Sequence, residues 1–120
     1  MKVMIVDDSK SMRMIVKRTL KQAGFDDMEF EEAEDGTDAL AKIDACNPKL
    51  VLCDWNMPQM NGIDFLKAIR AAGNNVDFGF VTTESTPEMR GQAQEAGAQF
   101  LVAKPFTAAT FQRTLEPILG

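Results

Sequence analysis

Four short apolar runs and one alternating stretch divide the sequence, and a segment with helical spacing follows each of them. They lie at residues 2–6, 28–32, 50–53, 78–81 and 100–103, the second being the alternating stretch. Runs of this length suit strands, whereas apolar residues repeated every three or four positions suit amphipathic helices. Strands that alternate with helices build βαβ units, so the pattern predicts an α/β fold: a five-stranded, parallel sheet with helices on both faces.

The expected helices have recognisable starts and one apolar side each. Asp8 or Ser9 can cap the first helix, Ser85 or Thr86 the fourth, and Thr107 the last. The residues expected to face the core are Met12, Ile15, Val16 and Leu20, then Leu40 and Ile43, then Ile63, Leu66 and Ile69, and finally Phe111, Leu115 and Ile118. No linker or repeat interrupts this order, so residues 1–120 are expected to form a single domain.

The apolar content of the chain indicates a globular protein. Hydrophobic residues make up 45% of the sequence, and no apolar run approaches the ~20 residues that span a bilayer. The N-terminal run is too short for a signal peptide and meets two acids at once. We therefore expect a cytoplasmic monomer that binds no membrane, with Cys46 and Cys53 as free thiols.

The charge of the chain excludes other classes of protein. A net charge of −5 and a pI of about 4.7 argue against a nucleic-acid surface, which needs a basic patch. Acids gather at residues 26–35, where Met28 and Phe30 alternate with glutamates, as in a half-buried strand at the edge of a sheet. The chain has no histidine, so any histidine in its chemistry must belong to a partner.

Polar residues follow four of the five expected strands. The carboxyl ends of parallel strands share one edge of the sheet, where ligands bind. The residues at these ends are Asp7 and Asp8, then Asp54, then Thr82, Thr83 and Glu84, and lastly Lys104 and Pro105. Taken singly, Asp54 is an ordinary turn residue and Asp8 an ordinary helix cap. Their joint placement favours one shared site.

Three carboxylates at one edge repel one another, so a positive charge should join them. Lys104 is one candidate and a divalent cation is the other, and oxygen ligands alone favour Mg²⁺. The sequence has no Ser/His pair and no glycine-rich phosphate loop, but a carboxylate can act as a nucleophile and become an aspartyl phosphate. Asp54 is then the central acid, Asp7 and Asp8 hold the metal, and Lys104 and Thr82 contact the phosphoryl group.

Four motifs occur in order between Val3 and Phe111, namely VDDS, DWNMPQMNG, VTTE and AKPF. Together they resemble the receiver domain of two-component response regulators, and DDSKSMRMIVKRTL and DWNMP are most similar to the stand-alone receivers of chemotaxis. The resemblance implies a flavodoxin-like fold with strand order 2-1-3-4-5. It also implies a phosphoprotein of a phosphorelay that catalyses only its own phosphorylation and dephosphorylation and is otherwise no enzyme.

The resemblance also implies a role for each residue of the site. Asp54 would accept a phosphoryl group from a phosphohistidine on a sensor histidine kinase, which suits a chain without histidine. Asp8 and Asp54 would ligate Mg²⁺ directly, together with the backbone carbonyl of Asn56, and Asp7 would act through water. Asn56 and Glu84 match the positions that tune hydrolysis of the acyl phosphate.

Three further features concern the loops around the site. The resemblance implies a cis peptide bond between Lys104 and Pro105. Leu101 replaces the family's switch aromatic, which turns inward when Thr82 moves to the phosphoryl group, so we expect a smaller rearrangement of the loop after the fourth strand. Thr83 stands where the chemotaxis receiver has alanine, and it is expected to narrow access to the acids.

Several functions are compatible with this site. The leading hypothesis is a phosphorylation-driven module that binds a partner through its fourth helix, fifth strand and fifth helix. That partner is either a flagellar motor switch protein or a histidine phosphotransfer protein, which would make the chain a relay intermediate or a phosphate sink. The second hypothesis is a Mg²⁺-dependent phosphatase with an aspartyl nucleophile; Asn56 opposes it, because that mechanism needs a carboxylate there. A flavodoxin, the third, would need a phosphate loop after the first strand.

Overall fold

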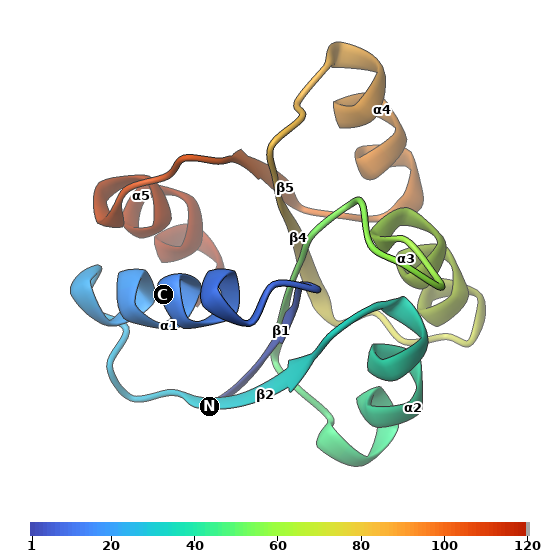
Figure 1. The fold of residues 1–120 in the computed structure, drawn as a ribbon, viewed down its shortest axis with the longest axis horizontal. Coiled ribbons are helices and arrows are strands. Elements are labelled where there is room, and N and C mark those ends of the chain that lie inside the picture. Colours follow the sequence, from blue (N-terminus) through green and yellow to red (C-terminus); the bar gives the residue numbers. More distant parts are fainter. Residues whose placement is uncertain (120) are drawn as a thin grey trace.

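The computed structural model describes residues 1–119, which contain one sheet of five parallel strands (Figure 1). Across the sheet they are β2 (Glu29–Ala33), β1 (Lys2–Val6), β3 (Leu50–Cys53), β4 (Asp77–Thr82) and β5 (Phe100–Ala103). This order, with a helix after every strand, is that of the flavodoxin-like receiver fold and confirms the predicted topology. The strands agree with the predicted stretches except that β2 lies one residue later and β4 extends one residue further at each end.

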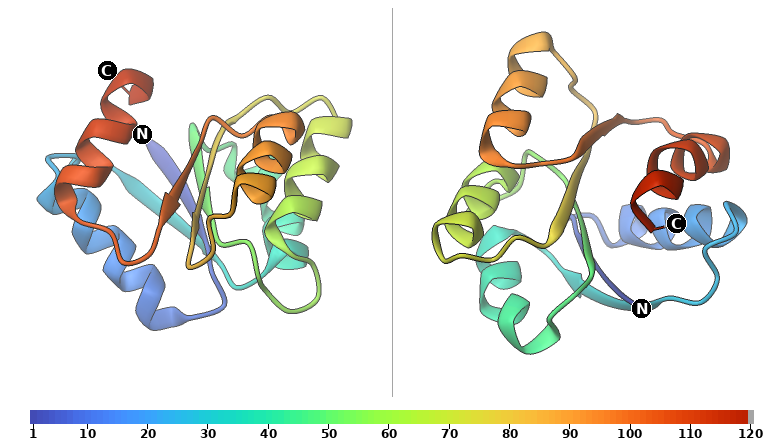
Figure 2. Two further views of the ribbon diagram at one scale, coloured as in Figure 1. Left: turned by 90° about the horizontal axis from the view of Figure 1, so that it is seen from above. Right: turned by 180° about the vertical axis from the view of Figure 1, so that it is seen from behind.

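Five helices cover the two faces of the sheet. The helix α1 (Lys10–Gln22) and the helix α5 (Ala108–Leu119) lie side by side on one face. The other face carries α2 (Gly36–Cys46), α3 (Gly62–Ala71) and α4 (Pro87–Ala96), as Figures 1 and 2 show. None of these helices, within residues 1–119, combines the length and the apolar character that a membrane crossing needs.

Side-chain caps set the helix starts. For α1 and α4 the sequence offered two candidate caps each, and the structure shows which of them is used. The Oγ of Ser9, not the carboxylate of Asp8, accepts a hydrogen bond from the backbone N–H of Met12 at the start of α1. Likewise Thr86 rather than Ser85 caps α4. Asp8 is therefore left free for another role.

The core consists of two apolar layers, one on each side of the sheet. Two residues expected to face it do not: 43% of Ile15 and 38% of Leu40 is exposed. The helix α1 turns Val16 and Leu20 inward, and Ile15 lies about 100° around the helix from Val16. Leu40 is displaced from the buried Ala39 in the same way. Only a narrow stripe of each helix is buried, so an apolar residue next to that stripe remains exposed to solvent.

The strand β2 lies at one edge of the sheet, because it pairs only with β1. Met28 and Phe30 are half-buried, whereas Glu29 is exposed. The acidic stretch is thus an edge strand, as predicted, and its charges discourage pairing with a second chain.

Candidate functional site

The register of the sheet brings the first and third strands to an end at the same level. Val6 is paired with Ala33 on one side and with Cys53 on the other. The backbone N–H of Asp54 donates to the carbonyl of Val6 at 2.8 Å, and that of Asp7 donates to the carbonyl of Ala33 at 3.1 Å. Both aspartates therefore leave the sheet side by side.

The three predicted acids form one cluster. Asp7, Asp8 and Asp54 each offer a carboxylate oxygen within 4.8 Å of the other two. Asp7 is buried, Asp54 is half-buried and Asp8 is exposed. The cluster is consequently open to solvent on the side of Asp8.

Lys104 joins this cluster from the end of β5. Its backbone N–H donates to the carbonyl of Thr82, and its Nζ lies 3.0 Å from Oδ2 of Asp7 and 3.3 Å from Oδ2 of Asp54. Only 10% of the lysine side chain is exposed. One buried ammonium thus bridges two of the three carboxylates, and the peptide bond that follows it, between Lys104 and Pro105, is cis.

The charges of this cluster do not balance. Burial raises the pKa of Asp54, Lys104 opposes that rise, and the neighbouring Asp7 adds to it. Three carboxylates and one ammonium leave an excess of negative charge. An acidic triad of this kind is typical of a Mg²⁺ site, and its oxygen donors, with an open side for water, fit that ion.

The turn after β3 holds Asp54 firmly. The backbone N–H of Trp55 donates to Oδ1 of Asp54 at 2.7 Å, and the N–H of Gly62 donates to the carbonyl of Trp55. A Cβ on Gly62 would lie 2.1 Å from the carbonyl oxygen of Asp54, so only glycine allows α3 to begin this close to the acid. Trp55 is 7% exposed and packs against Phe80 with ring centroids 4.7 Å apart.

Thr82 ends β4 beside Lys104 and is fully buried. Its Oγ1 is buried without a hydrogen-bond partner, the sole side-chain atom of that kind within residues 1–119. An unpaired buried hydroxyl destabilises the fold, so its presence here needs a reason. Thr83 and Glu84, which follow it, are exposed, as is Asn56 after Asp54.

The two apolar residues of β5 near the site lie on opposite faces of the sheet. Leu101 packs against the core layer of α2, α3 and α4. Phe100 packs into the other layer, where its ring covers Gly79 so closely that a Cβ there would lie 2.0 Å from it. Phe100 therefore does not replace the aromatic that is missing at Leu101.

Arg13 contacts this region and has no role in the predicted site. Its Nη1 donates to the backbone carbonyl of Asp7 at 2.6 Å. Helical spacing could have indicated this contact in the sequence, because Arg13 lies on the same helix face as the buried Val16 and Leu20. A cation on a buried helix face needs an acceptor or an acidic partner.

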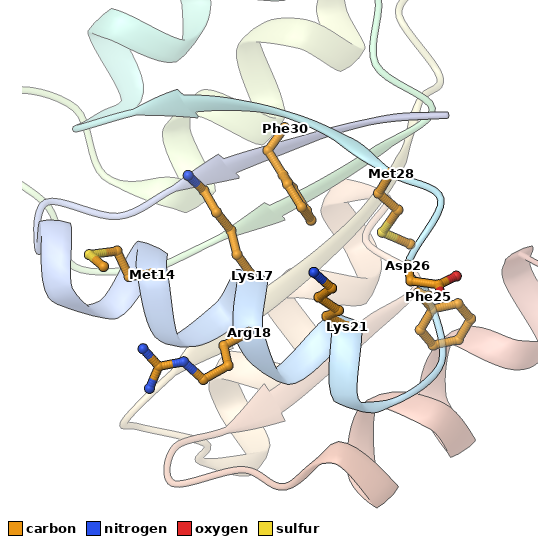
Figure 3. Close-up of a pocket in the computed structure, with 8 residues that line it drawn as sticks. All are labelled: Met14, Lys17, Arg18, Lys21, Phe25, Asp26, Met28 and Phe30. Carbon is orange, nitrogen blue, oxygen red and sulfur yellow. The ribbon is translucent and has the colours of Figure 1, made fainter.

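A cavity of about 540 Å³ lies elsewhere, between α1 and β2 (Figure 3). Its lining residues are Met14, Lys17, Arg18, Lys21, Phe25, Asp26, Met28 and Phe30. None of these belongs to the acidic cluster, so the cavity is separate from the candidate site.

The sequence matches the family described as response regulator receiver domain over residues 3–116. The chain therefore belongs to this family, and it is a receiver rather than a conventional enzyme. Membership implies a histidine kinase as phosphodonor, and the acidic cluster is consistent with a phosphoacceptor site.

Within the family, the chain is homologous to chemotaxis proteins of the CheY type. It is 40% identical over 123 residues to chemotaxis protein CheY1 of Helicobacter pylori strain J99, covering all of this chain and 98% of that one. It is 42% identical over 120 residues to CheY-3 of Vibrio cholerae, covering 98% of this chain and 91% of that one. The crystal structure of Vibrio cholerae CheY4 superposes with a TM-score of 0.85 at 38% identity, covering 98% of this chain and 97% of that one.

Proposed function

We propose that residues 1–120 act as a single cytoplasmic receiver domain that takes a phosphoryl group from a sensor histidine kinase onto Asp54. One observation carries this proposal: three carboxylates, one buried lysine and one unpaired buried hydroxyl meet where four parallel strands end. The acids suit a divalent cation, and the lysine and hydroxyl suit phosphoryl oxygens.

In the proposed transfer, an Asp54 carboxylate oxygen attacks phosphorus while the bond from phosphorus to the kinase imidazole breaks. Lys104, now paired with Asp54, then contacts a phosphoryl oxygen. Asp8, Asp54 and the carbonyl of Asn56 would hold Mg²⁺, with Asp7 acting through water. The ion, when bound, neutralises charge on the phosphoryl oxygens.

The hydroxyl of Thr82 is the natural reporter of phosphorylation. It has no hydrogen-bond partner among residues 1–119, and a phosphoryl oxygen would give it one. We propose that Thr82 moves toward that oxygen and draws the loop after β4 with it, while Leu101 moves little. Different Leu101 rotamers in unphosphorylated and beryllofluoride-bound crystal structures would contradict the proposal that Leu101 moves little.

The exposed residues around the cluster are proposed to set the lifetime of the phosphoryl group. Asn56 and Glu84 would tune attack by water, and Thr83 would narrow the approach to Asp54. A Thr83→Ala variant should therefore be phosphorylated and dephosphorylated faster, and unchanged rates would refute the role of Thr83.

The output is proposed to be binding of a partner in chemotaxis, through the surface of α4, β5 and α5. The names of the relatives from Helicobacter and Vibrio support chemotaxis. A flagellar motor switch protein is then the expected partner, and a histidine phosphotransfer protein is the alternative. Purified candidates of both kinds, titrated against the beryllofluoride-treated chain, distinguish the two.

The central experiment measures phosphoryl incorporation from acetyl phosphate with Mg²⁺. We expect stoichiometric labelling of the natural chain, none of Asp54→Asn, and normal labelling of Asp44→Asn, which removes an exposed acid of α2. Trp55 fluorescence should change on Mg²⁺ addition and again with acetyl phosphate. Labelling of Asp54→Asn, or turnover of a phosphomonoester, would overturn the proposal.

A further inference from the structure

Arg13 points inward from α1 and is held at two places. Its Nε donates to Oε1 of Glu32 in β2 at 2.8 Å, and its Nη1 donates to the carbonyl of Asp7 at 2.6 Å. Only 14% of its side chain is exposed, which is uncommon for a cation on a surface helix. The guanidinium thus connects the edge strand to the loop that carries two of the three acids.

The contact from Arg13 supplies the last hydrogen-bond partner that Asp7 needs in the loop after β1. The N–H of Asp7 binds the carbonyl of Ala33, its Oδ1 accepts from the N–H of Ser9, and its Oδ2 faces Lys104. With Arg13 on the carbonyl, every polar atom of Asp7 has a partner. The Asp8 carboxylate, by contrast, accepts no hydrogen bond from any described residue, so only the backbone of the loop on either side holds Asp8 in place.

Glu32 is a firm anchor for Arg13. Lys17 Nζ lies 2.6 Å from Oε2 of Glu32, and Figure 3 shows Lys17 extending from α1 toward the sheet beside Phe30. Lys42 of α2 donates to the backbone carbonyl of Glu32 at 2.8 Å. The hydrogen bonds from Lys17 and Arg13 lower the pKa of Glu32 and keep it ionised. Contacts from two helices, α1 and α2, therefore hold Glu32, the residue of β2 to which Arg13 is bound.

Resting on the function proposed above, we propose that Arg13 is a positioning residue for the metal-binding acids. By spanning Glu32 and the carbonyl of Asp7, it fixes the loop after β1 so that Asp7 and Asp8 converge on Asp54. The planar guanidinium reaches the two acceptors with two separate nitrogens in fixed geometry, whereas a lysine at position 13 would have to reach both with its one ammonium nitrogen. Loss of such a supporting contact weakens metal binding by roughly 10- to 100-fold, and we expect the lower end because Arg13 holds backbone.

The test compares Arg13→Gln with Arg18→Gln. Arg18 lies on the same helix, is exposed and has no hydrogen-bond partner within residues 1–119, so both variants lose the same charge. Mg²⁺ binding is measured by isothermal titration calorimetry and by Trp55 fluorescence. We expect the Kd for Mg²⁺ to rise about tenfold in Arg13→Gln and to stay unchanged in Arg18→Gln.

Urea unfolding without Mg²⁺ separates positioning from a purely structural role. A structural role would lower the unfolding midpoint of Arg13→Gln and leave the Mg²⁺ Kd of the folded protein unchanged, which would overturn the proposal. Should Arg13→Gln fail to fold, Arg13→Lys is the second variant. It keeps the charge and should still lose most of the affinity, and full affinity in Arg13→Lys would refute the two-point span.

Two further variants complete the test. Adding Glu32→Gln to Arg13→Gln should cost no further affinity, because both act along one path, and additive losses would contradict the proposal. The variant Asp8→Asn separates the proposed role of Arg13 from the proposed metal site itself. If Asp8→Asn loses Mg²⁺ binding and Arg13→Gln does not, only the role of Arg13 is wrong. If Asp8→Asn binds Mg²⁺ normally, the proposed metal site is wrong.

Discussion

Two charged regions flank the loop after β1, and their charge balance is opposite. Around Glu32, two basic side chains approach one carboxylate, at 2.6 and 2.8 Å. At the strand ends, one ammonium, that of Lys104, meets a cluster of three carboxylates. The first region has one cation more than it has carboxylates, whereas the second is short of positive charge.

The pKa values of the two regions reflect this contrast. Hydrogen bonds from Lys17 and Arg13 lower the pKa of Glu32, but burial raises that of Asp54 despite Lys104. The two regions together hold three cations and four carboxylates, and two of the cations lie beside the single carboxylate of Glu32. The deficit at the strand ends is then a property of the site, and a divalent cation or a protein cation can fill it.

The largest expected effect is the response of stability to Mg²⁺. An ion that fills the deficit should stabilise the natural chain by about 2.7 kcal/mol at a concentration about 100 times its Kd. Asp8→Asn should lose this gain, whereas Asp44→Asn should keep it, because Asp44 is exposed on α2. Urea unfolding with Mg²⁺ and with a chelator measures the gain. An Asp8→Asn variant that retains it would show that the deficit is not a metal site.

Removing the ammonium should have the next largest effect. Lys104→Met leaves two carboxylates, 5% and 12% exposed, without their cation, and we expect the free energy of unfolding without Mg²⁺ to fall by about 2 kcal/mol. Proton uptake by Asp54 limits the loss. Mg²⁺ should then bind more tightly, since it no longer competes with the lysine. Lys67→Met, on the exposed face of α3, is the control, and weaker Mg²⁺ binding in Lys104→Met would contradict the competition.

Thr82→Val should have a smaller effect of opposite sign. The variant removes a buried hydroxyl that has no hydrogen-bond partner in the described part of the chain, so the unphosphorylated fold should gain about 1 kcal/mol. Thr19→Val is a matched control, because the buried Thr19 hydroxyl donates to the carbonyl of Ile15 at 2.7 Å and its removal should bring no gain. Thermal unfolding compares the two. An equal gain in both would mean that the unpaired state of Thr82 is of no consequence.

Much of the fold was predictable, because its signals are local. Apolar runs and cap residues gave the strands, the helices and the parallel sheet. The wrong assignments, Ile15 and Leu40, concern the width of the buried stripe on a helix, which depends on how closely that helix packs on the sheet. The apolar pattern alone does not contain that distance.

Some features of the candidate site were likewise predictable from the sequence, and others were not. The convergence of Asp7, Asp54 and Lys104 was predictable, since it depends only on where parallel strands end. The contact of Arg13 with a backbone carbonyl was not, because no residue type identifies such an acceptor in the sequence. The unpaired state of Thr82 likewise depends on packing around the end of β4, which the sequence pattern leaves open.

The smallest and sharpest prediction concerns pH. The pKa of Glu32 is lowered from 4.5, so the stability that it contributes is present above that value and is lost as pH falls through its folded pKa. The pKa of Asp54 is raised from 3.8, so the folded chain binds a proton on Asp54 more tightly than the unfolded chain does. The folded chain therefore becomes less stable as pH rises through the pKa of Asp54.

Without Mg²⁺, Glu32→Gln should therefore be less stable than the natural chain near neutral pH, and Asp54→Asn should be more stable. Both differences should shrink on acidification, as urea unfolding between about pH 3 and pH 7 can measure. Differences of the same sign would show that the two regions are balanced alike, and the contrast between them would fail.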